Sequence, residues 1–255
     1  MPKLWVRHLL RKLKTKVCKC IIMDHAHVSH LDDSSFQELI LPSIAAAPGM
    51  EIKFSTTHQG IYVLSSKKPN MSREWYHWAQ DEPGINIFLS MWNCPREAWN
   101  ALGPLVRLNE SAEGVCLKIS GDESGDNPSL FPSTAFMEFP NVHSIEMKLP
   151  YDEVLANLRY LASPVASSSS GGGLKWPCPK LSSIQVKVHG LHGRKTIVSD
   201  LLLTLVRRRH GSDGNGGILT VVDPPKPLQK IIIDSSILSE LPEGGPFEAV
   251  HLSSP

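Results

Sequence analysis

Histidine and aspartate residues gather in one short stretch near the start of this 255-residue chain. The ten residues from Asp24 to Asp33 hold three of each type, shortly after a pair of cysteines. Imidazole, carboxylate and thiolate groups are the ligands of zinc, so His25, His27 and Asp32 are the candidate metal ligands. His25 and His27 would share one face of a strand, because strand side chains alternate with a period of two. The cluster raises the hypothesis of a metal-dependent or hydrolytic enzyme.

The competing interpretation of this cluster is a histidine-rich loop between a strand and a helix. No second pair of cysteines or histidines follows at the spacing of a zinc site. The glycine-rich segment 211–217 follows a predicted helix and precedes a predicted strand. That order is the reverse of the one in which a helix N-terminus holds a phosphate. No Gly-x-Ser-x-Gly or Walker sequence occurs either. We therefore expect no catalytic residue, no metal and no cofactor.

A short apolar pattern recurs along the chain and predicts its strands. Apolar residues stand at offsets 0, +3 and +5, and several copies follow a proline. The last two positions of each copy are two residues apart, so they lie on one face of a strand. Five copies lie at 17–22, 142–147, 181–186, 228–233 and 247–252, and a looser copy ends in Leu117 and Ile119.

Amphipathic helices are predicted between these strands, at 36–44, 95–106, 152–161 and 196–205. We expect Asp152 to cap the third helix, and the basic run 207–210 to interact favourably with the dipole at the end of the fourth. The segment 50–65 contains two strands around a turn, which is typical of a hairpin. Serine and glycine near 164–175, and glycine at 211–217, predict flexible insertions.

The alternation of strands and helices predicts the fold class. One strand and one helix cannot bury their apolar faces alone, but stacked neighbouring units can. We therefore predict an α/β fold, a leucine-rich-repeat-like solenoid. It would have a curved parallel sheet, helices on the convex side and one inserted hairpin. Residues 1–17 are predicted to form a basic amphipathic helix that caps the solenoid. Residues 18–255 are predicted to form a single leucine-rich-repeat-like domain.

The net charge of +1 is the sum of two unequal regions. The first 20 residues hold seven lysines and arginines and no acid, so the rest of the chain has six more acids than bases. This excess argues against nucleic-acid binding by the repeats. The basic start is interpreted as a packed helix, with targeting or membrane-surface binding as alternatives. Apolar runs are too short to span a membrane, and five scattered cysteines indicate an intracellular protein, cytoplasmic or nuclear.

Three strings carry a resemblance to a known family: WPCPKLSSI (176–184), LTLVRRRHG (203–211) and PLQKIIID (227–234). They resemble the C-terminal region of fungal F-box proteins with divergent leucine-rich repeats, over about residues 139–235. In that family an F-box docks on the adaptor of a ubiquitin ligase, and the repeats present the substrate. The resemblance implies a non-catalytic protein-protein interaction module. No segment of this sequence resembles the F-box itself, so the F-box lies upstream or the repeats act alone.

Six side chains are predicted to contact a protein partner of unknown identity. Strand residues between the inward apolar positions would face the concave surface. Two tryptophans three residues apart would share one helix face, where they serve either core packing or partner binding. The candidates are Glu146, Lys148, Gln185, Lys187, Trp75 and Trp78.

Overall fold

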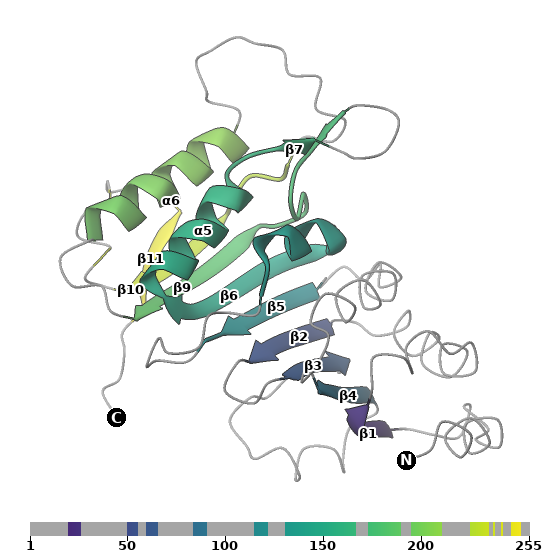
Figure 1. Ribbon diagram of the computed structural model, residues 1–255. Coiled ribbons are helices and arrows are strands. Elements are labelled where there is room, and N and C mark those ends of the chain that lie inside the picture. The colour runs from purple at the N-terminus through teal and green to yellow at the C-terminus, as the bar shows by residue number, and fades with distance from the viewer. Residues whose placement is uncertain are drawn as a thin grey trace. The chain divides into compact units, whose positions relative to one another are not determined.

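The computed structural model describes residues 20–26, 50–55, 60–65, 84–90, 115–121, 131–166, 173–189, 195–210, 225–234, 237, 241 and 246–250. The chain divides into two units, Met1–Leu117 and Lys118–Pro255. The described part is α/β, with a parallel four-stranded sheet and helices in the second unit (Figure 1). Among the described residues, no helix combines the length and the apolar character that a membrane crossing requires.

The first unit is built on strands β1 (Cys20–Ala26), β2 (Met50–Ser55), β3 (Gly60–Ser65) and β4 (Gly84–Ser90). Their order in the sheet is β1-β4-β3-β2. The hairpin predicted at 50–65 is confirmed, because β2 and β3 pair antiparallel. Strand β3 also pairs antiparallel with β4, which in turn pairs parallel with β1. The hairpin is therefore integrated into a mixed sheet. The helices predicted at 1–17, 36–44 and 95–106 lie outside the described residues.

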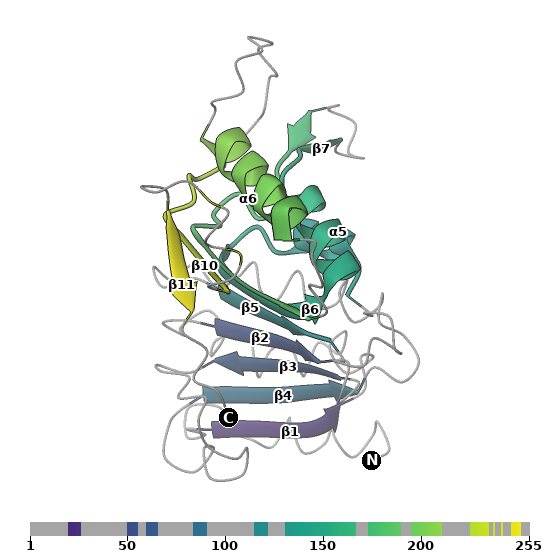
Figure 2. The ribbon, with the colours of Figure 1, turned by 90° about the vertical axis from the view of Figure 1, so that its left-hand side faces the viewer.

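Strand β5 (Val115–Ser120) spans the boundary between the two units. The elements of the second unit then begin with the 3-10 helix η2 (Ser133–Glu138), β6 (Val142–Pro150), α5 (Tyr151–Leu161), β7 (Val165–Ala166) and β8 (Leu174–Lys175). They continue with β9 (Ser183–His189), α6 (Lys195–Arg209), β10 (Lys230–Asp234) and β11 (Phe247–Val250). Strands β6, β9, β10 and β11 are parallel neighbours in chain order. Helix α5 lies in the connection from β6 to β9 and α6 in that from β9 to β10, and both helices lie on the same face of the sheet (Figure 2).

The core of the second unit lies between the sheet and the two helices. Alternate residues in β6, β9 and β10 are buried, as expected where one sheet face packs on helices. Buried helix residues recur at intervals of three and four, which forms one apolar stripe per helix. The buried positions are Ile145, Met147, Leu149, Ile184, Val186, Ile231 and Ile233 in the strands, and Val154, Leu158, Leu161, Val198, Leu202 and Leu205 in the helices.

The strand register confirms the apolar pattern in the copies of β6, β9 and β10, and corrects it in the copy at 247–252. Ile184 of β9 pairs with Ile145 of β6 and with Ile231 of β10, so the +3 positions are aligned. Ile231 pairs on its other side with Phe247, which the pattern had placed at offset 0. The copy at 247–252 is therefore shifted by three residues, with Phe247 at the +3 position. Its +5 position is Ala249, a small side chain whose weak apolar signal hid the correct alignment.

Helix α5 differs from the prediction at its amino end. Its N-cap residue is Pro150, and no side chain there caps the helix. The prediction that Asp152 is the cap is wrong, because the helix begins immediately after the last residue of β6. Asp152 and Glu153 stand instead in the first turn, where negative charge interacts favourably with the helix dipole. After α5, the ends of the segment predicted as a flexible insertion pair as β7 and β8.

Candidate interaction surface

The parallel sheet of the second unit has an open face, defined as the face opposite α5 and α6 (Figure 2). On β6 and β9 the residues that alternate with the buried ones belong to this face. Glu146 and Gln185 are register partners, and so are Lys148 and Lys187. Lys148 is exposed and the other three are half-buried. Four of the six side chains that the sequence predicted for partner binding are thus brought together on adjacent strands.

Charge and apolar surface are mixed on the open face. The Nζ atom of Lys118 in β5 lies 3.6 Å from Oε2 of Glu146. Both side chains are partly solvated, so this ion pair orients the carboxylate and adds little stability. On the other side, Ile232 of β10 is the register partner of Gln185 and is half-buried. The face therefore offers a carboxylate, ammonium groups, a carboxamide and an aliphatic side chain over four neighbouring strands, β5, β6, β9 and β10.

The remaining sequence candidates are not brought to this face by any described contact. Trp75, Trp78, His27 and Asp32 lie outside the described residues. His25 belongs to strand β1 in the first unit. Within the described ranges, no group of three or more histidine, cysteine, aspartate or glutamate side chains is arranged to hold a metal ion.

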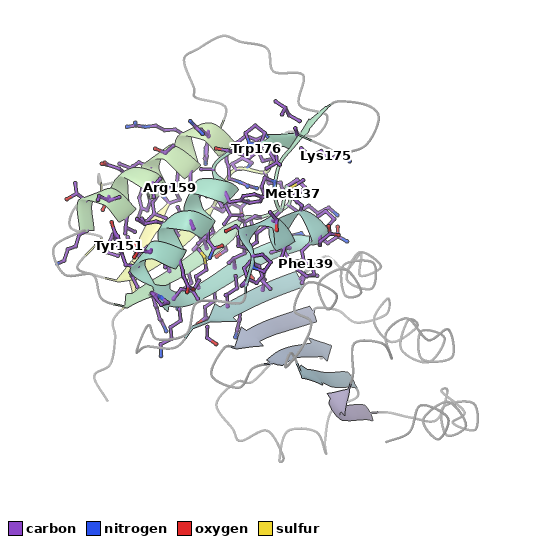
Figure 3. All side chains as sticks on the ribbon, viewed as in Figure 1. Met137, Phe139, Tyr151, Arg159, Lys175 and Trp176 are labelled. Carbon is purple, nitrogen blue, oxygen red and sulfur yellow. The ribbon has the colours of Figure 1, made fainter. Side chains whose placement is uncertain are left out.

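A buried arginine that sequence analysis missed fixes the loop ahead of β9. Arg209, the last residue of α6, is only 3% exposed. Its Nη2 donates a hydrogen bond of 2.9 Å to the carbonyl oxygen of Cys178, and Nη1 donates one of 3.4 Å to that of Pro177. Its Nε donates to the carbonyl of Lys226, ahead of β10. The guanidinium also lies 5.8 Å from the ring centre of Trp176, which Figure 3 shows at the end of the unit away from Tyr151.

Helical spacing is the signal that could have identified this arginine. Val198, Leu202, Leu205 and Arg209 follow one another at intervals of four, three and four residues on the buried stripe of α6. Burial lowers the pKa of Arg209 to about 10, which still leaves it protonated at neutral pH. Among the described residues its N–H groups meet carbonyl oxygens rather than a carboxylate.

Cys178 lies at the centre of the same loop and is fully buried. Its backbone has a φ of 43°, in the left-handed region that non-glycine residues seldom adopt. Its Sγ donates a hydrogen bond of 3.3 Å to the carbonyl oxygen of Phe136. Burial raises the pKa of this thiol to about 12, although the charge of Arg209 opposes the shift. The thiol therefore stays protonated and serves packing rather than nucleophilic chemistry.

Arg208, the residue before Arg209, connects α6 to α5. Nη1 of Arg208 donates hydrogen bonds of 3.2 Å to the carbonyl of Ala162 and 2.8 Å to Oγ of Ser163, at the carboxyl end of α5. A cation at that end interacts favourably with the helix dipole. The prediction for the basic run of α6 is thereby refined, because Arg208 caps the neighbouring helix while Arg209 holds a loop.

The open face can bind by ion pairs, hydrogen bonds and a modest apolar contact, which is the chemistry of protein recognition. Arg209 fixes the loops ahead of β9 and β10, and Arg208 fixes α6 to the carboxyl end of α5. Comparison with known proteins adds no further assignment. No family model, no curated protein and no solved structure matches this chain.

Proposed function

We propose that this chain is a non-catalytic protein-interaction module that binds its partner on the open face of the parallel sheet. The observation that carries the proposal is the register of β6 and β9. It sets Glu146 beside Gln185 and Lys148 beside Lys187, with all four side chains solvent-accessible. A rigid sheet presents such groups without the entropy cost of ordering a loop, which favours affinity.

The finer architecture that we propose is a leucine-rich-repeat-like solenoid with a curved sheet. Two features support it. Strands β6, β9, β10 and β11 are parallel and follow one another in chain order. Three copies of the apolar pattern are in register, so each strand-helix unit buries its apolar face against the next. A solenoid of this kind gives the open face its extended, repeated character.

The wider role that we propose is substrate recognition in an F-box-type ubiquitin-ligase assembly within the cytoplasm or nucleus. The resemblance of residues 176–184, 203–211 and 227–234 supports it. Two of these strings meet in the folded chain, because Arg209 from the second binds the carbonyls of residues 177–179 in the first. In this role the repeats would hold the substrate and an F-box segment would hold the adaptor.

Affinity capture from the native cell, followed by mass spectrometry, tests the proposal. The full chain is compared with K187E and with K195E, which makes the same charge change at the start of α6, away from the open face. We expect K187E to lose partners that the wild type and K195E retain, because charge reversal at an interface repels a complementary surface. Equal capture by K187E would contradict binding on this face. Repeated absence of the ubiquitin-ligase adaptor from wild-type captures would contradict the ligase role alone.

A further inference from the structure

The end of the second unit where β9 and β10 begin is rich in positive charge. We call this surface the basic edge. Its exposed members are Lys175, Lys180, Arg207, Lys226 and Lys230, and its half-buried member is His143. The described segments that form it, 139–144, 173–183, 205–210 and 225–233, contain no acidic residue. The chain as a whole is nearly neutral, so this is a local concentration of charge.

Backbone hydrogen bonds hold the strand-entry loops of the basic edge side by side. The N–H of Lys226 donates to the carbonyl of Pro179 over 2.8 Å, and the N–H of Ser182 donates to that of His143 over 2.9 Å. The buried Arg209 connects the same loops, because it donates hydrogen bonds to the carbonyls of Cys178 and Lys226. The backbone segments that carry Lys180 and Lys226 are therefore held side by side in a fixed arrangement.

The positive charge of the basic edge acts on the imidazole of His143. Its Nδ1 lies 2.8 Å from the carbonyl oxygen of Asn141. Burial is the main cause that lowers its pKa, the contact with Asn141 raises it in part, and the charges of Lys226 and Lys180 lower it further. Two loops that are 46 residues apart in sequence thus act electrostatically on one ring.

We propose that the basic edge binds an acidic segment of the protein partner, an extended run of glutamates and aspartates. This inference rests on the proposed function, because it names the chemistry of the partner that the module recognises. Carboxylates of such a segment would form ion pairs with Lys180 and Lys226, whose loops lie side by side. Binding would also draw the acidic segment along the entry ends of β9 and β10, next to the open face.

The composition of the basic edge favours an acidic peptide over nucleic acid or membrane. Arg208 and Arg209 already donate N–H groups to backbone carbonyls, so much of the forked geometry that suits phosphate is used within the fold. The remaining groups are mostly lysines, which act as point charges towards flexible carboxylates. Strong binding of duplex DNA also needs many phosphate contacts, whereas this surface is short and the chain beyond residue 20 has an excess of acids.

A direct test measures binding of a short fluorescent oligoglutamate peptide to the full chain by anisotropy. The variants are K180E/K226E at the basic edge and R159E/K195E on α5 and α6, which has the same total charge and leaves both the basic edge and the open face intact. We expect the first to weaken binding by about tenfold or more and the second by less than about twofold. The proton signals of His143 supply a second readout. Its pKa should rise when peptide is added, because the bound carboxylates offset the charges of Lys180 and Lys226.

Several results would overturn the proposal. They are absence of peptide binding, equal binding by K180E/K226E, or tighter binding of a short DNA duplex or of phosphatidylserine vesicles with the same dependence on these lysines. Because Lys180 and Lys226 are exposed, circular dichroism of K180E/K226E should show an unchanged fold, and K180Q/K226Q serves as a milder pair. Failure here leaves the open-face proposal intact, since that proposal depends on the behaviour of K187E in native captures.

Discussion

Lys148 of β6 and Lys187 of β9 are register partners on adjacent parallel strands. Neighbouring strands lie about 4.8 Å apart, so two positively charged side chains leave the same face of the sheet at adjacent positions. Like charges directly opposite each other destabilise a sheet. Under the proposed function, the binding partner would place opposite charge over this pair.

The first prediction concerns this lysine pair. K187E should raise the free energy of unfolding by about 0.2–1 kcal/mol, because it places opposite charges on adjacent strands. Urea denaturation of the full chain measures the effect. K187Q removes the charge without reversing it, so its free energy of unfolding should rise by less than that of K187E. A lower stability for K187E than for K187Q would contradict the assigned register.

The second prediction concerns the buried arginine. R209M should lower the free energy of unfolding by about 2–4 kcal/mol, because several carbonyl oxygens of residues 177–179 would lose their donors. R207A removes an exposed arginine from the same helix turn. It should change the stability by no more than about 0.5 kcal/mol. Similar urea midpoints for the two variants would show that Arg209 does not hold the loop.

The third prediction concerns the reactivity of Cys178. Its burial and its pKa of about 12 should keep it unlabelled by iodoacetamide in the native protein near neutral pH. Peptide mapping by mass spectrometry distinguishes it from the other four cysteines. R209M should increase its labelling, because the loop would open more often. Labelling of the native thiol at the rate found in urea would contradict this packing.

The fourth prediction concerns pH. The pKa of His143 is lowered from 6.5, chiefly by burial, so the folded protein favours the neutral imidazole. As the pH falls, the unfolded chain takes up the proton first, and stability decreases. The contribution of His143 is complete above 6.5 and is lost as the pH falls through that value towards the folded pKa. Urea midpoints at about pH 7.5 and about pH 5.5 should therefore differ less in H143Q than in the wild type. If the midpoints at the two pH values differ equally in H143Q and the wild type, His143 does not contribute to the pH dependence of stability.

The local elements were predictable because their signals are strong and repeated. Helices α5 and α6 and strands β6, β9 and β10 all carry apolar residues at regular spacing, and three copies of the strand pattern align in the register. Strand β11 was misaligned by three residues because Ala249 contributes little apolar signal. Register depends on which face is buried, and short strands with small residues specify it weakly.

Long-range relationships were harder to predict. The pairing of β1 with β4, and the placement of β3 between β4 and β2, depend on contacts that a sequence pattern does not encode. The charge of Arg209 predicts an interaction with the helix dipole, whereas its position on the apolar stripe of α6 indicates burial. Asp152 was assigned as a cap from its residue type, whereas Pro150 decides where the helix begins. In both helices the residue type alone misleads, and the position of the residue along the helix decides its role.

The most direct measurement of the central claim places a photo-crosslinking amino acid at one position at a time in the full chain. Position 185 lies on the open face, and the matched control, position 156, is exposed on α5. Illumination of native cell extract is followed by identification of the covalent adducts. Our account predicts that a protein partner is captured through position 185 and not through position 156. Capture of the same partner through position 156 alone would contradict it.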